Sequence, residues 1–345
     1  MSAQLAEVIT QWEGYELFSI NACYATDRKK LGGFSWRKFC LWLKYLSEAC
    51  LICAFHRIDC VIITHSFFRS AFLKDSFFLW LGRVFHRKMV VWVHMDPNRL
   101  HWKPETSRFV RYAKRVLTLP DKWVACTPGL MNQWPEAFDR KKLTALSNGI
   151  PDPVGNKTSK KKTHLHVVFL SSMTEEKGWR ELFATAEVLC SENPGVVFDF
   201  YGDPGAGESR ELLETVFAGS SHPDRILWHG GVWGDQKINV LLESDLFCLP
   251  SWTEAFPIAI IEAMACGLPV ISTRVGGVPD AITDGINGWL VEPRDQSGLL
   301  SALRDAVVQR DTLVNMGQNN RLRYLNNFSL SAFDKKWQQL LKSIC

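Results

Sequence analysis

The sequence predicts an α/β fold with two domains, each built on a parallel sheet that helices cover on both faces. Three observations predict it. The chain has 345 residues, more than a single hydrophobic core usually serves. Short apolar runs alternate with longer helical stretches in two separate series, which is typical of parallel sheets. Between the series lies IPDPVGNKTSKKKTH, residues 150–164, whose Pro, Gly, Ser and Lys content is typical of a linker.

The first series occupies residues 1–149. It opens directly with a helical stretch, SAQLAEVITQWEGYE. After it, β-branched and aromatic runs predict buried strands, and longer stretches between them predict helices. The predicted strands are 15–21, 60–64, 89–94, 123–127 and 143–147, and the predicted helices are 34–57, 70–86, 104–118 and 129–137.

The second series occupies residues 165–326. Its strands read HLHVVFLS, VVFDFYG, RILWHGG, DLFCLPS and PVIST, each followed by helical sequence. Residues 327–345 end in SLSAFDKKWQQLLKSIC, which predicts one more amphipathic helix, and we expect it to pack back toward the first domain. Ligands of open α/β sheets bind beyond the carboxyl ends of the strands, so we expect a ligand cleft there.

Composition and charge narrow the possible partners. With 46% hydrophobic and 22% charged residues, the chain is typical of a folded globular protein. Residues 1–150 hold 22 Lys and Arg against 12 Asp and Glu, and the remainder holds 18 against 24. The basic first half indicates an anionic surface or substrate. We expect no nucleic acid as a partner. The ten cysteines are scattered through apolar segments, which is typical of reduced thiols and predicts a cytoplasmic protein.

The predicted helix 34–57 combines many aromatic and aliphatic residues with Arg37, Lys38 and Lys44. Such a helix could lie on an anionic bilayer, which would place the protein peripherally on the inner face of the cell membrane. Ordinary packing within the first domain is the alternative. No stretch reaches the ~18 uncharged apolar residues that a transmembrane helix needs, so none is predicted.

The most informative stretch is EAFPIAIIEAMACG, which begins at Glu254 and places Glu262 within a very apolar run. Pro257 suits the first turn of a helix and Gly267 its end, so a helix is predicted over 257–266. A helix N-terminus binds anions, and carboxylates on either side of it could accept hydrogen bonds from sugar hydroxyls. The pattern therefore indicates a nucleotide sugar. The alternative is that Glu262 pairs with a buried Lys or Arg.

Lys177 follows the first strand of the second series, in SSMTEEKGWREL. At the carboxyl end of that strand, a lysine could neutralise a diphosphate. The alternative is an exposed lysine in a polar loop.

These segments resemble the retaining glycosyltransferases of family 4. EAFPIAIIE matches the family's E-x7-E motif, and the following Gly-Leu-Pro-Val, Gly-Gly and NGWLVEP segments extend the match over about 245–293. FLSSMTEEKG and the Ser-Asn-Gly at 147–149 give weaker support. The resemblance implies the GT-B fold, in which two Rossmann-like domains face each other across a cleft. It also implies transfer with retention of anomeric configuration.

The resemblance implies roles for individual residues. Glu254 would hold the hydroxyls of the donor sugar and Glu262 those of the ribose, while Lys177 and the amides at the helix start would hold the diphosphate. His94, at the end of the strand MVVWVH, matches a histidine that many members place near the donor sugar. The implied donor-binding residues are Ser172, Lys177, Glu254, Ala255, Phe256, Pro257, Ile258 and Glu262, and the implied catalytic residues are Glu254, Lys177 and His94.

The chain departs from the family pattern at two places. Ser172 stands where members often have an arginine that contacts the same phosphates. The family also begins with a strand and a glycine-rich loop, and both are expected to be missing here. A sheet without its first strand would leave unpaired neighbours at its centre.

The resulting hypothesis is transfer of a sugar from a nucleotide-diphosphate sugar to a saccharide or lipid-linked saccharide, in the synthesis of cell-surface polysaccharide or glycoconjugate. No Asp-x-Asp motif occurs, in agreement with the metal-independent chemistry that the resemblance implies. The alternative is an N-terminally truncated or degenerate, non-catalytic homologue that binds nucleotide sugar or a partner protein. A nicotinamide dehydrogenase needs GxGxxG after a strand, and GDPGAGES at 202–209 has the wrong spacing. A sugar epimerase has no support from the spacing of the two glutamates.

Overall fold

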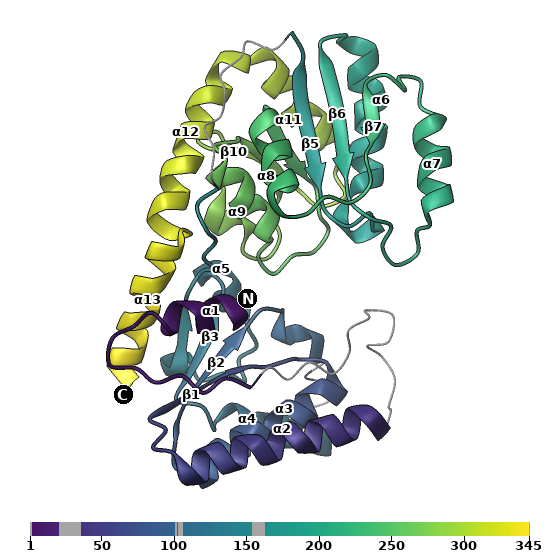
Figure 1. Cartoon of the computed structure of the whole chain (residues 1–345). Coiled ribbons are helices and arrows are strands. Elements are labelled where there is room, and N and C mark those ends of the chain that lie inside the picture. The colour runs from purple at the N-terminus through teal and green to yellow at the C-terminus, as the bar shows by residue number, and fades with distance from the viewer. Residues whose placement is uncertain (1, 21–35, 101, 103–105, 154–162, 345) are drawn as a thin grey trace. The chain divides into compact units, whose positions relative to one another are not determined.

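The computed structural model describes residues 2–20, 36–100, 102, 106–153 and 163–344. The chain divides into two compact units, the first comprising Met1–Leu146 with Asp334–Cys345 and the second Ser147–Phe333. Each unit holds one parallel sheet with helices packed on it (Figure 1). The predicted α/β fold class with two parallel sheets is therefore confirmed. Most of the expected linker, 154–162, lies outside the described residues.

The sheet of the first unit has four parallel strands in the order β1-β2-β3-β4. The strands are β1 (Cys60–Thr64), β2 (Lys88–Val93), β3 (Lys122–Ala125) and β4 (Leu143–Ala145). We expected unpaired strands at the centre of this sheet. Among the described strands there is no such gap, because β1 pairs directly with β2 over its whole length, from Cys60 opposite Lys88 to Thr64 opposite Trp92.

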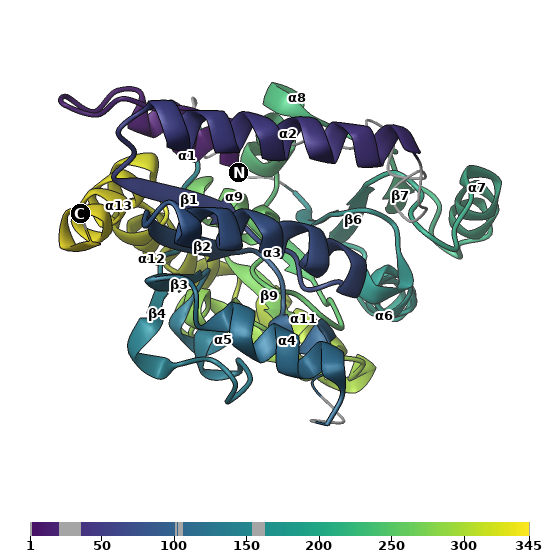
Figure 2. The ribbon, with the colours of Figure 1, turned by 90° about the horizontal axis from the view of Figure 1, so that it is seen from below.

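Up to β4, the described helices of the first unit come before β1 or connect the strands of the sheet. They are α1 (Ser2–Ile9), α2 (Trp36–Phe55), α3 (Arg69–Val84), α4 (Arg108–Leu117) and α5 (Pro128–Asn132). The predicted strand at 15–21 is wrong, since residues 15–20 have no regular structure and residue 21 is not described. A short aromatic and apolar run alone does not make a strand when no neighbouring strand pairs with it. Figure 2 shows α2 and α3 side by side over the sheet.

The C-terminal helix α13 (Leu330–Ile344) contributes its residues from Asp334 onward to the first unit. There Trp337 is fully buried and lies edge-on against Trp92 of β2, with ring centroids 5.1 Å apart. The indole of Trp12, just after α1, donates a hydrogen bond to the carboxylate of Asp334 at 2.5 Å. The two ends of the chain therefore pack on the same unit.

The sheet of the second unit has six parallel strands in the order β10-β9-β8-β5-β6-β7. They are β5 (Leu165–Leu170), β6 (Val196–Tyr201), β7 (Ile226–Trp228), β8 (Leu246–Leu249), β9 (Val270–Thr273) and β10 (Gly288–Val291). The helices are α6 (Trp179–Glu192), α7 (Arg210–Ala218), α8 (Gly234–Glu243), α9 (Ile258–Ala265), α10 (Val278–Ala281), α11 (Gln296–Val308) and α12 (Arg310–Asn327).

The strand order of the second sheet reverses direction at its centre. From β5 the chain proceeds to β6 and β7 on one side, and then returns to β8 on the other side of β5. Helices α6 and α11 pack together on one face of the sheet, and α8 and α9 pack together on the other (Figure 1). The connections on the two sides diverge at the carboxyl ends of β5 and β8, which is where open α/β sheets bind their ligands.

Candidate functional site

A pocket of about 370 Å³ opens where the strand order of the second sheet reverses. The last residues of β5 and β8 form part of its wall, and the first turn of α9 forms another part. Its lining residues are Leu170, Ser171, Lys177, Lys237, Leu249, Glu254, Pro257, Ile258, Ala259 and Glu262. The pocket therefore combines two carboxylates, two ammonium groups and a helix N-terminus.

Glu254 lines this pocket, and its carboxylate is held through one oxygen. Its Oε1 atom accepts hydrogen bonds from Lys177 Nζ at 2.5 Å and from Ser251 Oγ at 2.8 Å. The Glu254 side chain is only 9% exposed and that of Lys177 is 25% exposed. All hydrogen bonds of this carboxylate to other described residues go to Oε1, so Oε2 is available to a ligand.

Lys177 reaches Glu254 because the chain makes a tight turn after β5. Residues Glu175–Lys177 form a single 3-10 turn, which Gly178 ends in the left-handed conformation with φ 72°. A Cβ at Gly178 would stand 2.1 Å from the carbonyl oxygen of Pro250. Glycine is therefore required for the turn to approach the end of β8 this closely.

Glu262 lies on α9, one turn inside the helix, and is the charged residue of an otherwise apolar segment, IAIIEAMA. Its Oε1 atom accepts a hydrogen bond from the ammonium group of Lys237 on α8. Burial raises the pKa of Glu262, and the hydrogen bond from Lys237 acts in the opposite direction. The glutamate thus has a basic partner in the unliganded chain, which is the alternative that the sequence left open, and it also lines the pocket.

The start of α9 offers unpaired amides to the same pocket. Pro257 is the N-cap and has no N–H to donate, while its side chain makes no capping hydrogen bond. Within the described part of the chain, the amides of Ile258 and Ala259 donate no hydrogen bond. Free amides and the positive end of the helix dipole attract an anion.

Two consecutive glycines hold the loop that carries Glu254. The amide of Gly277 donates to the carbonyl of Ala255 at 2.8 Å. Gly276 has φ 52°, and a Cβ there would stand 1.9 Å from the carbonyl oxygen of Glu254. The backbone of the loop can therefore lie this close to Gly276 only because that residue has no side chain.

The remaining candidate residues lie at different places. Phe256 is buried and its ring packs on Phe328, with centroids 5.5 Å apart, so only its backbone is near α9's start. Ala255 is held through its carbonyl, as described above. Ser172 is exposed and does not line the pocket, whereas the preceding Ser171 does. The sequence reasoning missed Lys237 and Ser251.

His94 belongs to the first unit, where it follows β2. Its ring lies against Trp92, with centroids 4.2 Å apart, and its Nδ1 is 3.7 Å from Cys126 Sγ. Among the described residues its buried Nε2 atom has no hydrogen-bond partner. Burial lowers the pKa of His94 to about 4, so its imidazole is neutral at physiological pH.

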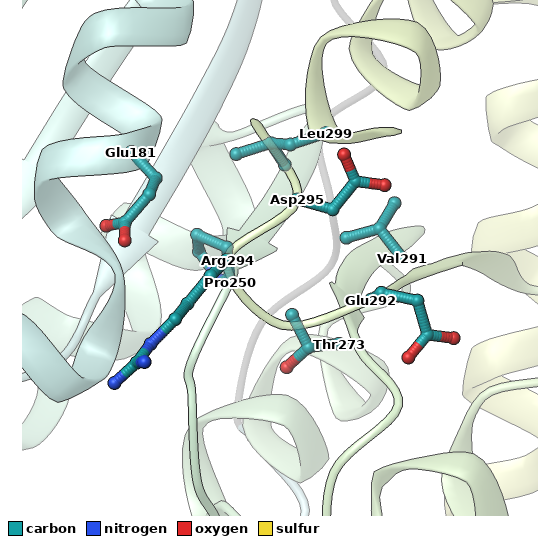
Figure 3. Close-up of a pocket in the computed structure, with 8 residues that line it drawn as sticks. All are labelled: Glu181, Pro250, Thr273, Val291, Glu292, Arg294, Asp295 and Leu299. Atoms are coloured by element: carbon teal, nitrogen blue, oxygen red, sulfur yellow. The ribbon is translucent and has the colours of Figure 1, made fainter. Parts of the chain in front are cut away.

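A second cavity lies beyond the carboxyl ends of β8, β9 and β10, on the face of the sheet that α6 and α11 cover (Figure 3). Its volume is about 10 Å³, which is room for a single water molecule. Glu181 borders it, and one of the Glu181 oxygens accepts a hydrogen bond from the indole of Trp252 at 2.8 Å. This cavity is too small for an organic ligand. Over the described ranges, no group of three or more His, Cys, Asp or Glu side chains could hold a metal ion.

Residues 154–323, nearly the whole second unit, match the family model of the group 1 glycosyl transferases. This unit belongs to the group 1 glycosyl transferases. The predicted family is thereby confirmed, and the E-x7-E glutamates and Lys177 fall within the matched residues.

Curated glycosyltransferases show the same relationship over different lengths. The chain is 26% identical over 257 residues to the putative colanic acid biosynthesis glycosyltransferase WcaL of Salmonella typhimurium, covering 71% of the chain and 60% of the relative. It is 34% identical over 149 residues to the phosphatidylinositol N-acetylglucosaminyltransferase gpi3 subunit of Schizosaccharomyces pombe, covering 41% of the chain and 31% of the relative. The matched part is thus less than two thirds of either relative.

Solved glycosyltransferase structures share the fold of both units. HepE of Anabaena in complex with UDP and glucose superposes with a TM-score of 0.69 at 18% identity, over 88% of the chain and 81% of HepE. A glycosyltransferase of Rickettsia africae superposes with a TM-score of 0.70 at 21% identity, over 90% and 83%. At these identities the likeness shows the fold alone, and it confirms the predicted GT-B class.

Proposed function

We propose that the protein is a retaining glycosyltransferase that moves a sugar from a nucleotide-diphosphate sugar to a saccharide or lipid-linked saccharide. The observation that carries the proposal is the pocket of the second unit. Along the chain, Glu254 comes before a helix start with unpaired amides and Glu262 comes one turn after it, and Lys177 lines the same pocket. A nucleotide sugar has the same order of groups, with hydroxyls at both ends and a diphosphate between them.

Each group of the pocket has a role in this proposal. Lys177 and the amides of Ile258 and Ala259 hold the diphosphate, and Glu262 accepts hydrogen bonds from the ribose. Glu254 accepts hydrogen bonds from the transferred sugar through its available oxygen. As the glycosidic bond breaks, negative charge grows on the leaving phosphate, where Lys177 and the positive end of α9 stabilise it. We therefore expect transfer to need no divalent metal.

His94 and Ser172 complete the candidate residues. A neutral imidazole can accept or donate one hydrogen bond, and His94 is proposed to contact the donor sugar. Ser172 offers the phosphates a hydroxyl and no positive charge. Retention of configuration requires the acceptor to attack from the face that the nucleotide leaves.

The relatives suggest the class of acceptor and donor. The name of WcaL refers to colanic acid biosynthesis, and a relative from Erwinia amylovora is named for amylovoran biosynthesis. HepE has been crystallised with UDP-glucose. A hexosyl donor and a polysaccharide acceptor are accordingly proposed, in the synthesis of cell-surface polysaccharide or glycoconjugate.

A lipid-linked acceptor would be reached from the membrane surface. Among the helices that the structure describes, none has the length and hydrophobicity that a bilayer-spanning segment needs. The eight cysteines of the described residues are free thiols, in keeping with a reducing compartment. Helices α2 and α3 carry six Lys and Arg against two Asp and Glu, together with exposed large apolar side chains. We propose a cytoplasmic protein that binds peripherally to the inner face of the membrane through these helices.

The test is a panel of UDP-, GDP- and ADP-sugars. We expect one nucleotide class to raise the melting temperature of the purified chain and the matching sugar nucleotide to be hydrolysed slowly. Addition of a chelator is expected to leave the rate unchanged. Binding without turnover, with acceptors present, would instead support the non-catalytic homologue. No stabilisation by any member of the panel would overturn the proposal.

A further inference from the structure

Lys237 is a feature of the pocket that neither the sequence motif nor the proposed roles include. It lies in the first turn of α8, which begins at Gly234, and its side chain is 26% exposed. The ammonium group reaches across to α9 and donates to Glu262 Oε1. Both residues line the pocket. The ion pair is thus part of the pocket wall and joins the two helices on that side.

The ion pair engages only one of the two carboxylate oxygens of Glu262. Lys237 occupies Oε1, and the structure gives Oε2 no hydrogen bond from any other described residue. The Glu262 side chain is 11% exposed, so the carboxylate has little access to bulk water. A carboxylate in this position is fixed through one oxygen and can offer the other to a ligand hydroxyl.

The other charged groups on the helices packed against α9 are exposed or have partners of their own. Asp235 and Glu243 of α8 are exposed, and Arg323 of α12 donates to Thr283 and to the carbonyl of Asp280. Glu254 and Lys177, which both line the pocket, pair with each other. On α12, Arg321 is occupied by Asp152, at 2.5 Å and 2.8 Å, and by the carbonyl of Ala265. Strand β8 contributes only the buried thiol of Cys248, and β9 (Val270–Thr273) contributes no charge. Lys237 is therefore the cation on which Glu262 depends within the described residues.

We propose that Lys237 is a positioning residue of the donor site, whose ion pair holds the Glu262 carboxylate in the orientation in which its second oxygen accepts ligand hydroxyls. This inference rests on the proposed function, because it takes Glu262 as the group that binds the ribose. It assigns to α8 a part in recognising the nucleoside, although no residue of α8 belongs to the E-x7-E segment.

Removal of Lys237 should make ligand binding depend on pH. Without its partner, only burial acts on Glu262, and burial raises the pKa of that carboxyl. A protonated carboxyl carries a hydrogen and loses acceptor capacity, so it binds hydroxyls less well. As the pH rises the carboxyl ionises again, and affinity should recover. In the unaltered chain, the hydrogen bond from Lys237 opposes this effect of burial on the pKa of Glu262, so its profile should be flatter.

The experiment titrates UDP, GDP and ADP into the full chain by calorimetry at several values between about pH 6 and pH 8.5. For the nucleotide that binds, Lys237→Met should weaken binding about ten-fold at neutral pH and recover most of the loss at the highest pH. Lys237→Arg should bind within about three-fold of the unaltered chain at every pH, because it keeps a cation. Gln236→Met is the matched control on the exposed side of α8, and its binding should not change.

A double-mutant cycle separates positioning from direct contact with phosphate. If Lys237 acts through Glu262, then Lys237→Met added to Glu262→Gln should cost no further affinity. The double variant also lacks an unpaired buried carboxylate, so it remains informative if Lys237→Met alone fails to fold. Additive losses that are equal at every pH, or unchanged binding by Lys237→Met, would overturn this inference alone. Absence of nucleotide binding by the unaltered chain would overturn the proposed function with it.

Discussion

Glu254 and Glu262 occupy similar pocket positions but have different partners. The Glu254 carboxylate accepts hydrogen bonds from Lys177 and Ser251. Glu262, one turn inside α9, pairs with Lys237. In the proposed complex, Glu262 binds the ribose, which every nucleotide carries. Glu254 binds the transferred sugar, which a free nucleoside diphosphate lacks. Substitution of Glu262 should therefore change the affinity for nucleotide, and substitution of Glu254 should mainly change turnover.

We expect Glu262→Gln to weaken binding of both nucleoside diphosphate and nucleotide sugar about ten-fold, since loss of a charge-assisted hydrogen bond costs roughly 1.5–3 kcal/mol. Glu254→Gln should lower turnover more than it lowers affinity for the free diphosphate. Stability without ligand should change little for Glu262→Gln, because Lys237 is partly exposed and can reach water. Calorimetry, initial rates and thermal melts measure these effects.

Glu292→Gln is the control for these substitutions, since Glu292 is 67% exposed and pairs with Arg274 at 3.5 Å. It should leave affinity and turnover unchanged. A sharp loss of stability in Glu262→Gln, with normal donor binding by the folded fraction, would instead mean that the residue serves only as the structural partner of Lys237.

At the scale of elements, the loop before α9 depends on the glycine turn that follows β9. An added Cβ at Gly276 would meet the carbonyl of Glu254 at 1.9 Å, so Gly276→Ala must displace the loop. We expect kcat/KM to fall at least about ten-fold, because catalysis tolerates little misplacement. Steady-state kinetics with the identified donor measures this.

Gly276→Ala would both strain the backbone and displace the loop that carries Glu254. Gly207→Ala is the control that introduces the strain alone. Gly207 also has a positive φ, of 87°, but an added Cβ there would meet nothing within 4 Å. It should therefore cost about 1 kcal/mol of stability through backbone strain and leave kcat/KM unchanged. Equal kinetic losses in the two variants would mean that strain alone, rather than displacement of Glu254, is responsible.

Helices α2 and α3 form the proposed membrane surface. Trp42 of α2 packs edge-on against Phe77 of α3, with centroids 5.1 Å apart. Nine large apolar side chains are exposed on these helices and the residue before α3, namely Trp36, Phe39, Leu43, Leu51, Phe55, Phe68, Leu73, Phe77 and Val84. Together with the excess of basic residues, this pattern is complementary to an anionic bilayer.

We expect the chain to co-sediment with vesicles that contain phosphatidylglycerol at low salt, and to be released as salt rises. Phe55, which is 79% exposed, should insert, so Phe55→Ser should weaken vesicle binding about ten-fold. Val308→Ser on α11 is the control, because Val308 is 83% exposed but lies in the second unit. Equal recovery in the supernatant with and without vesicles would refute the membrane surface.

At the scale of the whole molecule, the two units should respond differently to acid. Burial lowers the pKa of His65 to about 3 and that of His94 to about 4, both in the first unit. Each stays neutral when folded but binds a proton when unfolded below about pH 6.5, so at pH 5 each costs about 2 kcal/mol of stability. Burial raises the pKa of Asp75 to about 6, which returns about 1 kcal/mol.

The second unit lacks this sensitivity among its described residues. Burial would raise the pKa of Asp199, but hydrogen bonds from His166 and His229 lower it to about 2. Its contribution is therefore complete above about pH 4 and is lost only as the pH falls toward 2. Hydrogen exchange read by mass spectrometry at pH 7 and pH 5 should show the first unit losing about 2–3 kcal/mol, and the second unit almost nothing.

His94→Gln tests the origin of the acid response. It should remove about 2 kcal/mol of the difference between pH 7 and pH 5 in the first unit, whatever it does to stability at neutral pH. Equal destabilisation of the two units by acid, or an unchanged difference in His94→Gln, would contradict the assignment to buried histidines.

The sequence by itself determined the alternation of strands and helices, the two parallel sheets and the helix that carries Glu262, predicted over 257–266 and found at Ile258–Ala265. These features depend on neighbours only a few residues apart, and apolar periodicity reports them directly. The same local reasoning was wrong for the strand predicted at 15–21, because residues 15–20 find no neighbouring strand among the described residues.

Only the tertiary structure decided the partners within the pocket. Lys177 and Glu254 are 77 residues apart, and Lys237 and Glu262 are 25 apart. They meet because β8 returns to the far side of β5, and strand order is set by the packing of the whole unit rather than by local preference. For the same reason Glu262 could be recognised in the sequence as needing a partner, while Lys237 could be recognised as that partner only after α8 and α9 were seen side by side.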